Sequence, residues 1–415
     1  MSTSRTFQDM LNDYLANDIL EEAFVKRDFL LSKVEKDNSW KSGPLIVPFK
    51  AAGASSIAFG SLTASNDIGE DKFVRGEVSS IKEAWGSMIF NHRDIMEHDK
   101  ISEQNFLKIL PGAVEDFMDY MKNVVSCNLL NGSHFATLTA TGGAGGTMTV
   151  DRPDRFMINQ KVVVDDGDSL PSTGYVSAIN MNTKVVTLTA ARDGAGGAVD
   201  LSGYTVAQSA KCYHDGSQSN AFSDLKAALL SAANGGSSTL YGQTKVSYPY
   251  LQAINIDGST ITAANIMEKI FDALLTVRQF GRGNPTDVVM SYGHFSNCMK
   301  VIESSKGAFN VTPGSTKASQ YGWTELEVGS VTKGGLKLVA VQEMDNDVIH
   351  IIDWRALKFY SNGFFKKRMS PEGKEFFEVR NTTGYQYIVD VCLFGEFVVL
   401  RPSYCGIIYG ITYLS

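Results

Sequence analysis

The stretch from Ser102 to Gly132 constrains the fold of this 415-residue chain more than any other part of it. Its apolar residues recur at helical spacing, which places them on one face. They are Phe106, Leu107, Leu110, Val114, Phe117, Met118, Met121, Val124, Val125 and Leu129. Ser102 offers an N-terminal cap, Asn131-Gly132 supplies a stop, and Pro111 is expected to divide or bend the helix. The pattern predicts a long amphipathic helix that acts as a spine.

Residues 133–215 have a different character, because Thr, Val and Gly replace helix formers there. Turn signals such as Asp166-Gly167 and Asp193-Gly194 separate short β-rich runs. The glycine-rich runs at 142–146 and 194–197 lack the Lys-Ser/Thr pair of a phosphate-binding loop, so they are interpreted as flexible β-turns. This part of the chain predicts a separate all-β domain, inserted into the rest.

The chain before the long helix predicts an arm and a projecting loop. Residues 6–24 place their apolar side chains along one stripe, which predicts a first amphipathic helix. PLIVPFK, residues 44–50, predicts a short strand that leads into a Gly- and Ser-rich stretch at 51–71. Because that stretch is too polar to bury itself, we expect it to project before the chain returns through strand-like residues 73–90.

The second half of the chain predicts a mixture of helices and strands. Helices are expected near residues 223–233, 263–280 and 294–304, with a strand at Asp287–Ser291. The runs KEFFEVRN, YQYIVDVCLFG and EFVVLR predict strands towards the end. The whole chain is therefore expected to be α+β, with more than one lobe at this length.

Charge and cysteine usage exclude several classes of protein. A net charge of −7 argues against a surface that grips nucleic acid through phosphate neutralisation. No signal peptide or membrane-spanning stretch is evident, and we expect neither secretion nor membrane insertion. The five cysteines form no CxxC pair, which favours reduced thiols over a zinc site or disulfides. They are Cys127, Cys212, Cys298, Cys392 and Cys405.

The segment LVAVQEMDNDVIHIID, which begins at Leu338, places three acids near two apolar runs: Asp345, Asp347 and Asp353. Clustered carboxylates can bind a hard cation. Asp and Asn are also the residues that a tight turn requires, because their side chains bond to neighbouring backbone groups. We interpret the segment as a buried hairpin whose acids form the turn, and His350 as a structural histidine.

Other candidate sites are also weak. Asp165, Asp166 and Asp168 resemble the start of a calcium loop, but Val176 stands where an EF-hand has its closing glutamate, so a solvated turn is favoured. The basic cluster 366–368 is interpreted as a solvated loop or a contact for an acidic patch, with nucleic acid as the alternative. Since no GxSxG, HExxH or Cys-centred nucleophile motif occurs, no catalytic residue, cofactor or metal ligand is predicted.

The order of these parts resembles the major capsid proteins of tailed bacteriophages, which have the Hong Kong 97-type fold. An amphipathic arm, a loop between two strands, a long helix ending in LLNG and a mixed α/β lobe follow one another as in that family. GNPTDVVMS before a helix, KGGLKLVAVQEMDNDVIHIIDWRALKFY and EVRNTTGYQYIVDVCLFGEFVVLRPSYCGII are similar to its later elements. The match covers residues 1–132 and 216–415, and residues 133–215 are similar in kind to the β-rich insertions of some members.

The resemblance implies an α+β chain with six parts. These are an N-terminal arm (1–43), an extended loop with flanking strands (44–90), a peripheral domain with the spine helix (91–132), a β-rich insertion domain (133–215), an axial domain (216–360) and the C-terminal strands of the peripheral domain (361–415). It also implies a structural protein, not an enzyme, that assembles into pentamers and hexamers of an icosahedral head. That head would enclose double-stranded DNA without binding it specifically.

The resemblance further implies a place and partners for the chain. Assembly would occur in the cytoplasm of a bacterial host, and the product would belong to the virion. Scaffolding, portal and decoration proteins are the partner classes of such a shell. Some family members join their subunits through a Lys-Asn isopeptide bond, but no Lys lies between Ala51 and Asp71, so that crosslink is not predicted here.

Arms and loops that cannot fold on themselves gain order when they bury apolar surface across neighbouring subunits. We therefore expect inter-subunit contacts from three residues of the extended loop and three of the arm. They are Phe59, Leu62 and Ile68 in the loop, and Phe7, Leu11 and Leu15 in the arm.

Three alternatives remain open. An encapsulin-like compartment would share the fold and enclose a cargo protein instead of a genome. A β-rich hydrolase would use the acids near Asp165 or near Asp345 as paired carboxylates. A tail or adhesin protein is disfavoured by the long helices.

Overall fold

The computed structural model describes residues 28–41, 43–52, 72–78, 80–91, 103–167, 170–194, 196–205, 210–304, 325–328, 336–363, 365–367, 377–381 and 384–412. The chain divides into two compact units. The first, which we call the spine unit, comprises Met1–Asp28, Lys82–Asp224 and Gly363–Gly395. The second, the mixed-sheet unit, comprises Phe29–Ile81, Leu225–Asn362 and Glu396–Ser415.

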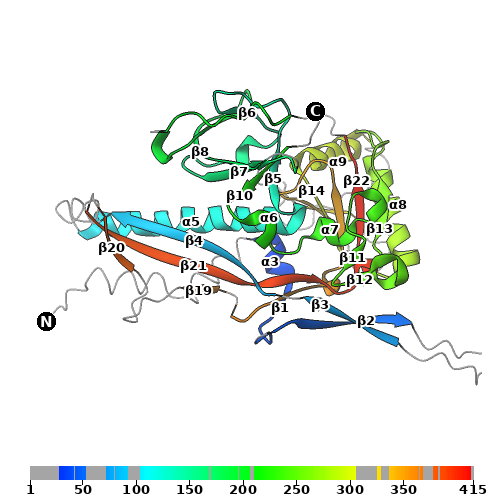
Figure 1. Ribbon diagram of the computed structural model, residues 1–415. Coiled ribbons are helices and arrows are strands. Elements are labelled where there is room, and N and C mark those ends of the chain that lie inside the picture. The colour runs from blue at the N-terminus through cyan, green and yellow to red at the C-terminus, as the bar shows by residue number, and fades with distance from the viewer. Residues whose placement is uncertain are drawn as a thin grey trace, which may run out of the picture. The chain divides into compact units, whose positions relative to one another are not determined.

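The predicted spine is one helix, α5, from Glu103 to Asn131, and it runs unbroken through Pro111. It lies along strand β4, Lys82–Asn91, and the long strand β21, Gly384–Val399 (Figure 1). Gly86 of β4 lets the helix approach closely, because a Cβ there would lie 2.5 Å from Cζ of Phe117. The amphipathic pattern thus identified a real helix, and a glycine opposite its aromatic residue allows the close packing.

Strand β21 is the centre of this part of the spine unit. It pairs antiparallel with β4 from Gln386 to Gly395, and on its other side with β19, Phe365–Lys367, and β20, Phe377–Asn381. On β4, Met88 is buried whereas Trp85 and Ile89 are half-exposed, as expected for a sheet with one face covered by a helix. The predicted strand-like residues 73–90 are therefore two separate strands, β3 and β4.

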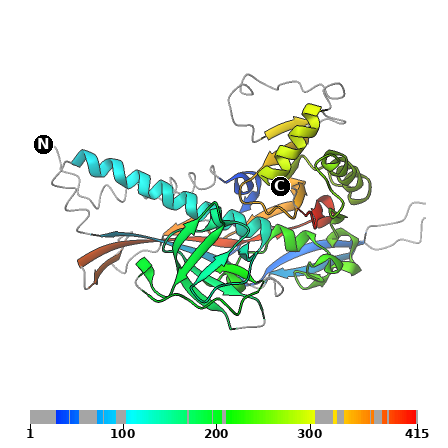
Figure 2. The ribbon, with the colours of Figure 1, turned by 90° about the horizontal axis from the view of Figure 1, so that it is seen from above.

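The β-rich stretch forms a six-stranded antiparallel sheet within the spine unit, in the order β5-β10-β7-β8-β9-β6 (Figure 2). Its strands are β5 His134–Thr137, β6 Thr147–Thr149, β7 Lys161–Asp165, β8 Ser172–Asn180, β9 Val185–Thr189 and β10 Lys211–His214. Apolar residues alternate inward along them and form one core, with Val162, Val176 and Leu188 fully buried. The prediction that these residues form strands is confirmed.

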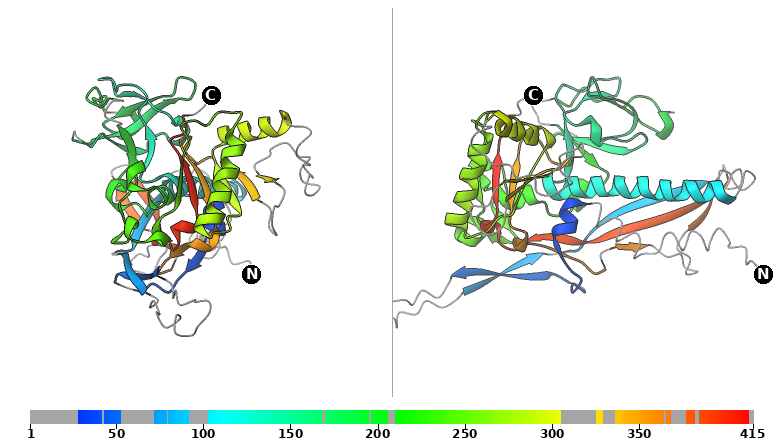
Figure 3. Two further views of the ribbon diagram at one scale, coloured as in Figure 1. Left: turned by 90° about the vertical axis from the view of Figure 1, so that its right-hand side faces the viewer. Right: turned by 180° about the vertical axis from the view of Figure 1, so that it is seen from behind.

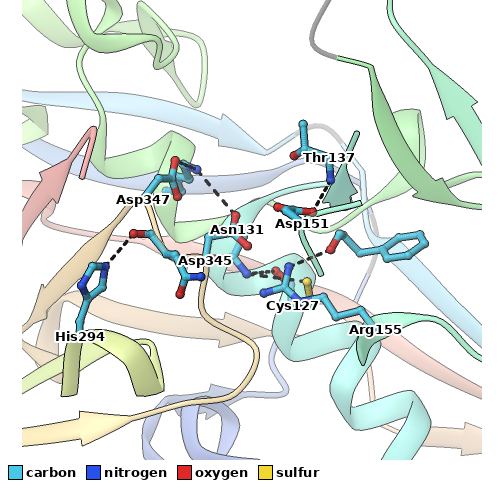
Figure 4. Close-up of polar contacts among 11 residues, drawn as sticks. Cys127, Asn131, Thr137, Asp151, Arg155, His294, Asp345 and Asp347 are labelled. Atoms are coloured by element: carbon cyan, nitrogen blue, oxygen red, sulfur yellow. Dashed lines mark hydrogen bonds and ion pairs between the residues drawn. The ribbon is translucent and has the colours of Figure 1, made fainter. Parts of the chain in front are cut away.

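The two outer strands of this sheet meet, which closes it into a barrel. Leu138 and Val150 form an antiparallel bridge, and the Asp151 backbone N–H donates to the Thr137 carbonyl oxygen at 3.0 Å. The Asp151 carboxylate in turn accepts the Thr137 backbone N–H at 2.7 Å (Figure 4). Closure leaves no unpaired sheet edge at this seam, which protects the strands from pairing with other chains.

The mixed-sheet unit is built on a six-stranded sheet with both parallel and antiparallel pairs. Its order is β13 Ile254–Asp257, β22 Gly406–Tyr409, β17 Ile349–Ile352, β14 Asp287–Met290, β16 Leu336–Ala340 and β15 Glu325–Val328. Helices α8, Ile266–Thr276, and α9, Tyr292–Ser304, pack beside the sheet (Figure 3) and share one apolar core with it. The predicted helices near 263–280 and 294–304 and the strand at 287–291 are confirmed.

The predicted hairpin at Leu338–Asp353 is wrong. Its two runs do form strands, β16 and β17, but β14 lies between them and pairs with both, parallel to β16 and antiparallel to β17. The residues between the runs therefore cross over the end of β14. Alternation of apolar residues within a segment predicts that the segment is a strand. Which strand it pairs with is a separate matter, and here it depends on β14, some fifty residues earlier in the chain.

Short elements complete the mixed-sheet unit. Helix α3, Phe29–Lys33, is followed by β1, Glu35–Asp37, which pairs parallel with β18, Leu357–Tyr360. Near residues 223–233, a single helical turn, α7 (Leu225–Leu229), replaces the longer helix that was predicted. Lys245 is buried and its Nζ donates to the carbonyl oxygens of Ala227 and Leu230, which caps this helix.

Candidate functional site

The described base of the predicted extended loop is a two-stranded ribbon in the mixed-sheet unit. Strand β2, Leu45–Ala52, pairs antiparallel with β3, Lys72–Val78. Its inner face buries Val47, Phe49 and Val78. Its outer face leaves large apolar side chains in solvent: Ile46 is 53% exposed and Phe73 is 65% exposed.

A two-stranded ribbon is marginally stable by itself, so its attachment to the unit decides whether it is held in place. That attachment is a small hairpin formed by β11, Thr239–Leu240, and β12, Gln243–Thr244. Between them Tyr241 and Gly242 have φ of 50° and 77°. Two successive left-handed residues are the requirement of a type I′ turn, which tyrosine enters at a cost of about 1–2 kcal/mol.

Tyr241 offsets that cost through three contacts. Its carbonyl oxygen accepts the Glu77 backbone N–H at 2.9 Å, and its hydroxyl oxygen accepts the Val399 backbone N–H at 2.8 Å. Its ring stacks on Phe49 with centroids 5.8 Å apart and an interplanar angle of 5°. One residue thus ties both strands of the ribbon to the C-terminal end of β21.

The ring stack depends on Gly76 of β3. A Cβ at this position would lie 2.2 Å from Cε2 of Phe49 and 3.1 Å from Cβ of Tyr241. The neighbouring Arg75 carbonyl oxygen accepts a hydrogen bond from Gln243 Nε2 at 2.8 Å. Glycine is therefore required because the Phe49 ring occupies the space of its missing side chain.

Replacing Tyr241 with phenylalanine is expected to lower the free energy of unfolding by about 1–2 kcal/mol, because the Val399 N–H loses its acceptor in a part-buried place. The turn and the ring stack should remain. Chemical denaturation measures the loss. Tyr248→Phe is the control, because no described residue bonds to that hydroxyl, and an equal loss in both variants would contradict the assignment.

The residues predicted to contact other subunits are not part of the described structure. Phe59, Leu62 and Ile68 of the loop, and Phe7, Leu11 and Leu15 of the arm, all lie outside the described residues. The anchor that the structure does describe was missed in the sequence. A Tyr-Gly pair between two short polar-apolar runs is a turn signal, but Tyr in place of Asn or Asp made it a weak one.

The candidate carboxylates near Asp345 form ion pairs within the mixed-sheet unit. Lys226 Nζ lies 2.8 Å from the Asp347 carboxylate and 3.8 Å from that of Asp345. On the same connection, His294 Nε2 lies 2.7 Å from the Asn346 carbonyl oxygen (Figure 4). Asp345 and Asp347 therefore lie in the connection between β16 and β17, which crosses over β14 and is not the hairpin turn that was predicted.

Asp353 has a structural role. Its carboxylate accepts two hydrogen bonds from the Arg355 guanidinium, at 2.9 and 2.6 Å, and one from the Asn284 backbone N–H at 3.0 Å. Burial acts to raise the pKa of Asp353, but the Arg355 guanidinium and these N–H donors hold it below its usual range. The carboxylate therefore stays ionised and joins the end of β17 to the residues before β14.

The remaining candidates also lie in structural positions. His350 is completely buried in β17, and Asp165 accepts the Gly167 backbone N–H at 2.9 Å in a tight turn, while Asp168 lies outside the described residues. The five cysteines are buried and unbonded to one another. Within the described ranges, no group of three or more His, Cys, Asp or Glu side chains could hold a metal ion, and no helix is long and apolar enough to cross a membrane.

No protein-family profile and no curated protein matches the sequence. Among solved structures, a chain of the cyanophage A-1(L) capsid asymmetric unit is similar over 100% of both chains, with 13% identity and a TM-score of 0.48. A chain from Gordonia phage Cozz covers 92% of this chain and 86% of its own, with 12% identity and a TM-score of 0.43. An encapsulin chain from Synechococcus elongatus covers 94% and 90%, with 8% identity and a TM-score of 0.41. Chains from phage XM1, satellite phage P4 and Mycobacterium phage Adephagia are also similar.

Proposed function

We propose that the chain is the major capsid protein of a tailed bacteriophage, with the Hong Kong 97-type fold. In this proposal it assembles into pentamers and hexamers of an icosahedral head that encloses double-stranded DNA. The observation that carries the proposal is the ribbon β2–β3, which is anchored through Tyr241 and presents Ile46 and Phe73 to solvent. Exposed apolar side chains on an anchored ribbon favour contact with a neighbouring copy.

The parts of the chain receive roles within this proposal. Residues 1–43 form the arm, 44–90 the extended loop with its strands, and 91–132 with 361–415 the peripheral domain. Residues 216–360 form the axial domain, and the barrel within 133–215 is an inserted domain. The loop and arm residues predicted from the sequence remain the proposed inter-subunit contacts, together with Ile46 and Phe73 on the described ribbon.

The proposal also assigns location and partners. The shell protein assembles in the bacterial cytoplasm and becomes part of the virion, with scaffolding, portal and decoration proteins as its partner classes. The net charge of −7 suits a wall that encloses DNA without adhering to it. No catalytic role is assigned to the candidate acids, because Asp345, Asp347 and Asp353 all have basic partners.

Electron microscopy of the purified full-length chain, with size-exclusion chromatography, tests the proposal. Rings of five or six subunits or closed shells are expected. A monomer at every concentration, also after co-expression with the other head proteins, would refute it. The content of the particles separates a phage shell from an encapsulin-like compartment: nuclease-protected double-stranded DNA supports the first, and a co-purifying cargo protein supports the second.

Phe73→Asp is expected to reduce the yield of assembled particles by about tenfold or more, since a buried Phe contributes about 1.5–3 kcal/mol to a contact. The fold of the free chain should be unaffected, because Phe73 is already exposed. Circular dichroism monitors folding and light scattering monitors assembly. Leu170→Asp, at a residue 90% exposed on the barrel, is the matched control, and unchanged assembly of Phe73→Asp would remove this ribbon from the interface.

A further inference from the structure

A cavity of about 310 Å³, partly open to solvent, lies in the spine unit between β4, the C-terminal half of α5 and the first and last strands of the barrel. Its wall is mainly apolar and includes Ala84, Val124, Val125 and Phe135. This volume lies at the lower end of the range of small-molecule sites, and is about twice that of a cavity that holds benzene. It is large enough for a molecule with one ring and a short substituent.

His214 lines this cavity. A chain of hydrogen bonds determines which of its two ring nitrogens carries the proton. The Met157 backbone N–H donates to Gln160 Oε1 at 2.8 Å, so the amide nitrogen of Gln160 is the atom that faces His214. That nitrogen lies 3.0 Å from His214 Nδ1 and can only donate, so Nδ1 accepts and carries no proton. In a neutral imidazole the proton must then be on Nε2.

His214 is neutral at physiological pH. Burial lowers the pKa of its imidazole to about 4. One ring face stacks on Phe135, with centroids 4.3 Å apart and an interplanar angle of 25°. No described residue accepts a hydrogen bond from Nε2, so the N–H of this cavity-lining residue has no acceptor among the described residues.

Asn128 of α5 also lines the cavity and carries a second neutral donor. Its Oδ1 accepts the Phe222 backbone N–H at 3.0 Å, which fixes the orientation of the carboxamide. Its Nδ2 is buried and has no hydrogen-bond acceptor among the described residues. A buried donor without an acceptor destabilises the protein, so an acceptor atom placed in the cavity would be favoured.

The charges around the cavity decide what class of molecule fits it. Two carboxylates, Glu83 and Asp215, line it, and each has a partner: Glu83 accepts the Trp85 indole N–H at 2.9 Å, and Asp215 lies 2.9 Å from Lys161 Nζ. Carboxylates that line the cavity disfavour an anion, while N–H donors that line it disfavour a cation. A neutral molecule with an acceptor oxygen meets both conditions.

We propose that this cavity is a binding site for a small, neutral, mainly apolar molecule with a carbonyl oxygen, which accepts hydrogen bonds from His214 Nε2–H and Asn128 Nδ2–H. The site goes beyond the proposed shell function and does not depend on it. Its position between the spine helix and the barrel means that an occupant contacts both, so bound ligand also stabilises this part of the spine unit.

Acetophenone and ethylbenzene form a matched pair of probes, because a carbonyl group in the first stands where the second has a methylene group. Isothermal titration and saturation-transfer NMR with the full-length protein are expected to show tighter binding of acetophenone. His214→Phe keeps the ring and removes the donor, so acetophenone binding should weaken about tenfold while ethylbenzene binding stays within about twofold. Equal affinity of the two probes for the unsubstituted protein would overturn the proposal.

Val124→Trp gives an independent test that leaves His214 and Gln160 in place. A larger side chain at this wall residue fills the cavity, so both probes should lose at least about tenfold in affinity. Binding of unchanged strength in this variant would place the probes elsewhere on the protein. Absence of binding by both probes to the unsubstituted protein at millimolar concentration would show that the cavity holds water only, and would also overturn the proposal.

Discussion

Gly76→Val is expected to detach the ribbon β2–β3 from its anchor. The added Cβ would lie 2.2 Å from Cε2 of Phe49, a residue that is only 4% exposed. Overpacking costs about 1–3 kcal/mol, and loss of the Phe49–Tyr241 stack adds about 0.5–1.5 kcal/mol. Hydrogen exchange of the amides in residues 45–52 and 72–78 should therefore accelerate about 100-fold.

The control for this substitution is Gly203→Val, where an added Cβ meets no atom within 4 Å. Exchange in the ribbon should be unchanged in that variant. If Gly76→Val leaves ribbon exchange as it is, the close approach of Phe49 does not hold the ribbon. Under the proposed function, a detached ribbon should also lower particle yield, which light scattering would record separately from exchange.

Asp287→Ala is expected to lower the free energy of unfolding of the mixed-sheet unit by about 1–3 kcal/mol, the cost of leaving part-buried hydrogen-bond donors without their acceptor. Asp287 is 2% exposed, and its carboxylate accepts Trp354 Nε1–H at 2.5 Å and the Thr286 hydroxyl at 2.7 Å. Lys33 Nζ lies 3.4 Å away. The substitution leaves a part-buried indole N–H and an ammonium group without this acceptor.

The same carboxylate holds helix α3 to the sheet. Phe29 of α3 contacts Trp354 edge to face, with centroids 5.6 Å apart, and Lys33 lies over both rings. Loss of Asp287 should therefore increase hydrogen exchange in α3 before the rest of the unit. Asp347→Ala is the matched control, because its carboxylate is 51% exposed and its pair with Lys226 contributes about 1 kcal/mol or less. Equal losses in the two variants would contradict the role assigned to Asp287.

Several elements could be predicted because their signal is local. The spine was expected between Ser102 and Gly132 and extends from Glu103 to Asn131, since a long run of apolar residues at helical spacing specifies one helix. Alternating Val, Thr and Gly with turn residues likewise identified the strands of the barrel. Pro111 was expected to divide or bend the helix, and it does not divide it, since α5 is continuous from Glu103 to Asn131.

The candidate site, in which Tyr241 anchors the ribbon β2–β3, could not be predicted because it depends on contacts between residues distant in the chain. Tyr241 meets Phe49 and Val399, and nothing in the residues around Tyr241 indicates those partners. The hairpin predicted at Leu338–Asp353 failed for the same reason, because β14 competes for the edges of both strands. A strand pattern specifies which face is apolar, but not which other strand will cover its hydrogen-bonding edge.

The sequence by itself determined the α+β class, the long helix and the β-rich stretch, since each follows from periodicity within one segment. Only the tertiary structure decided the strand order around β14, the closure of the barrel through Asp151 and the anchoring of the ribbon by Tyr241. These features depend on pairing between remote segments, whose free energy is realised only when the whole unit has packed.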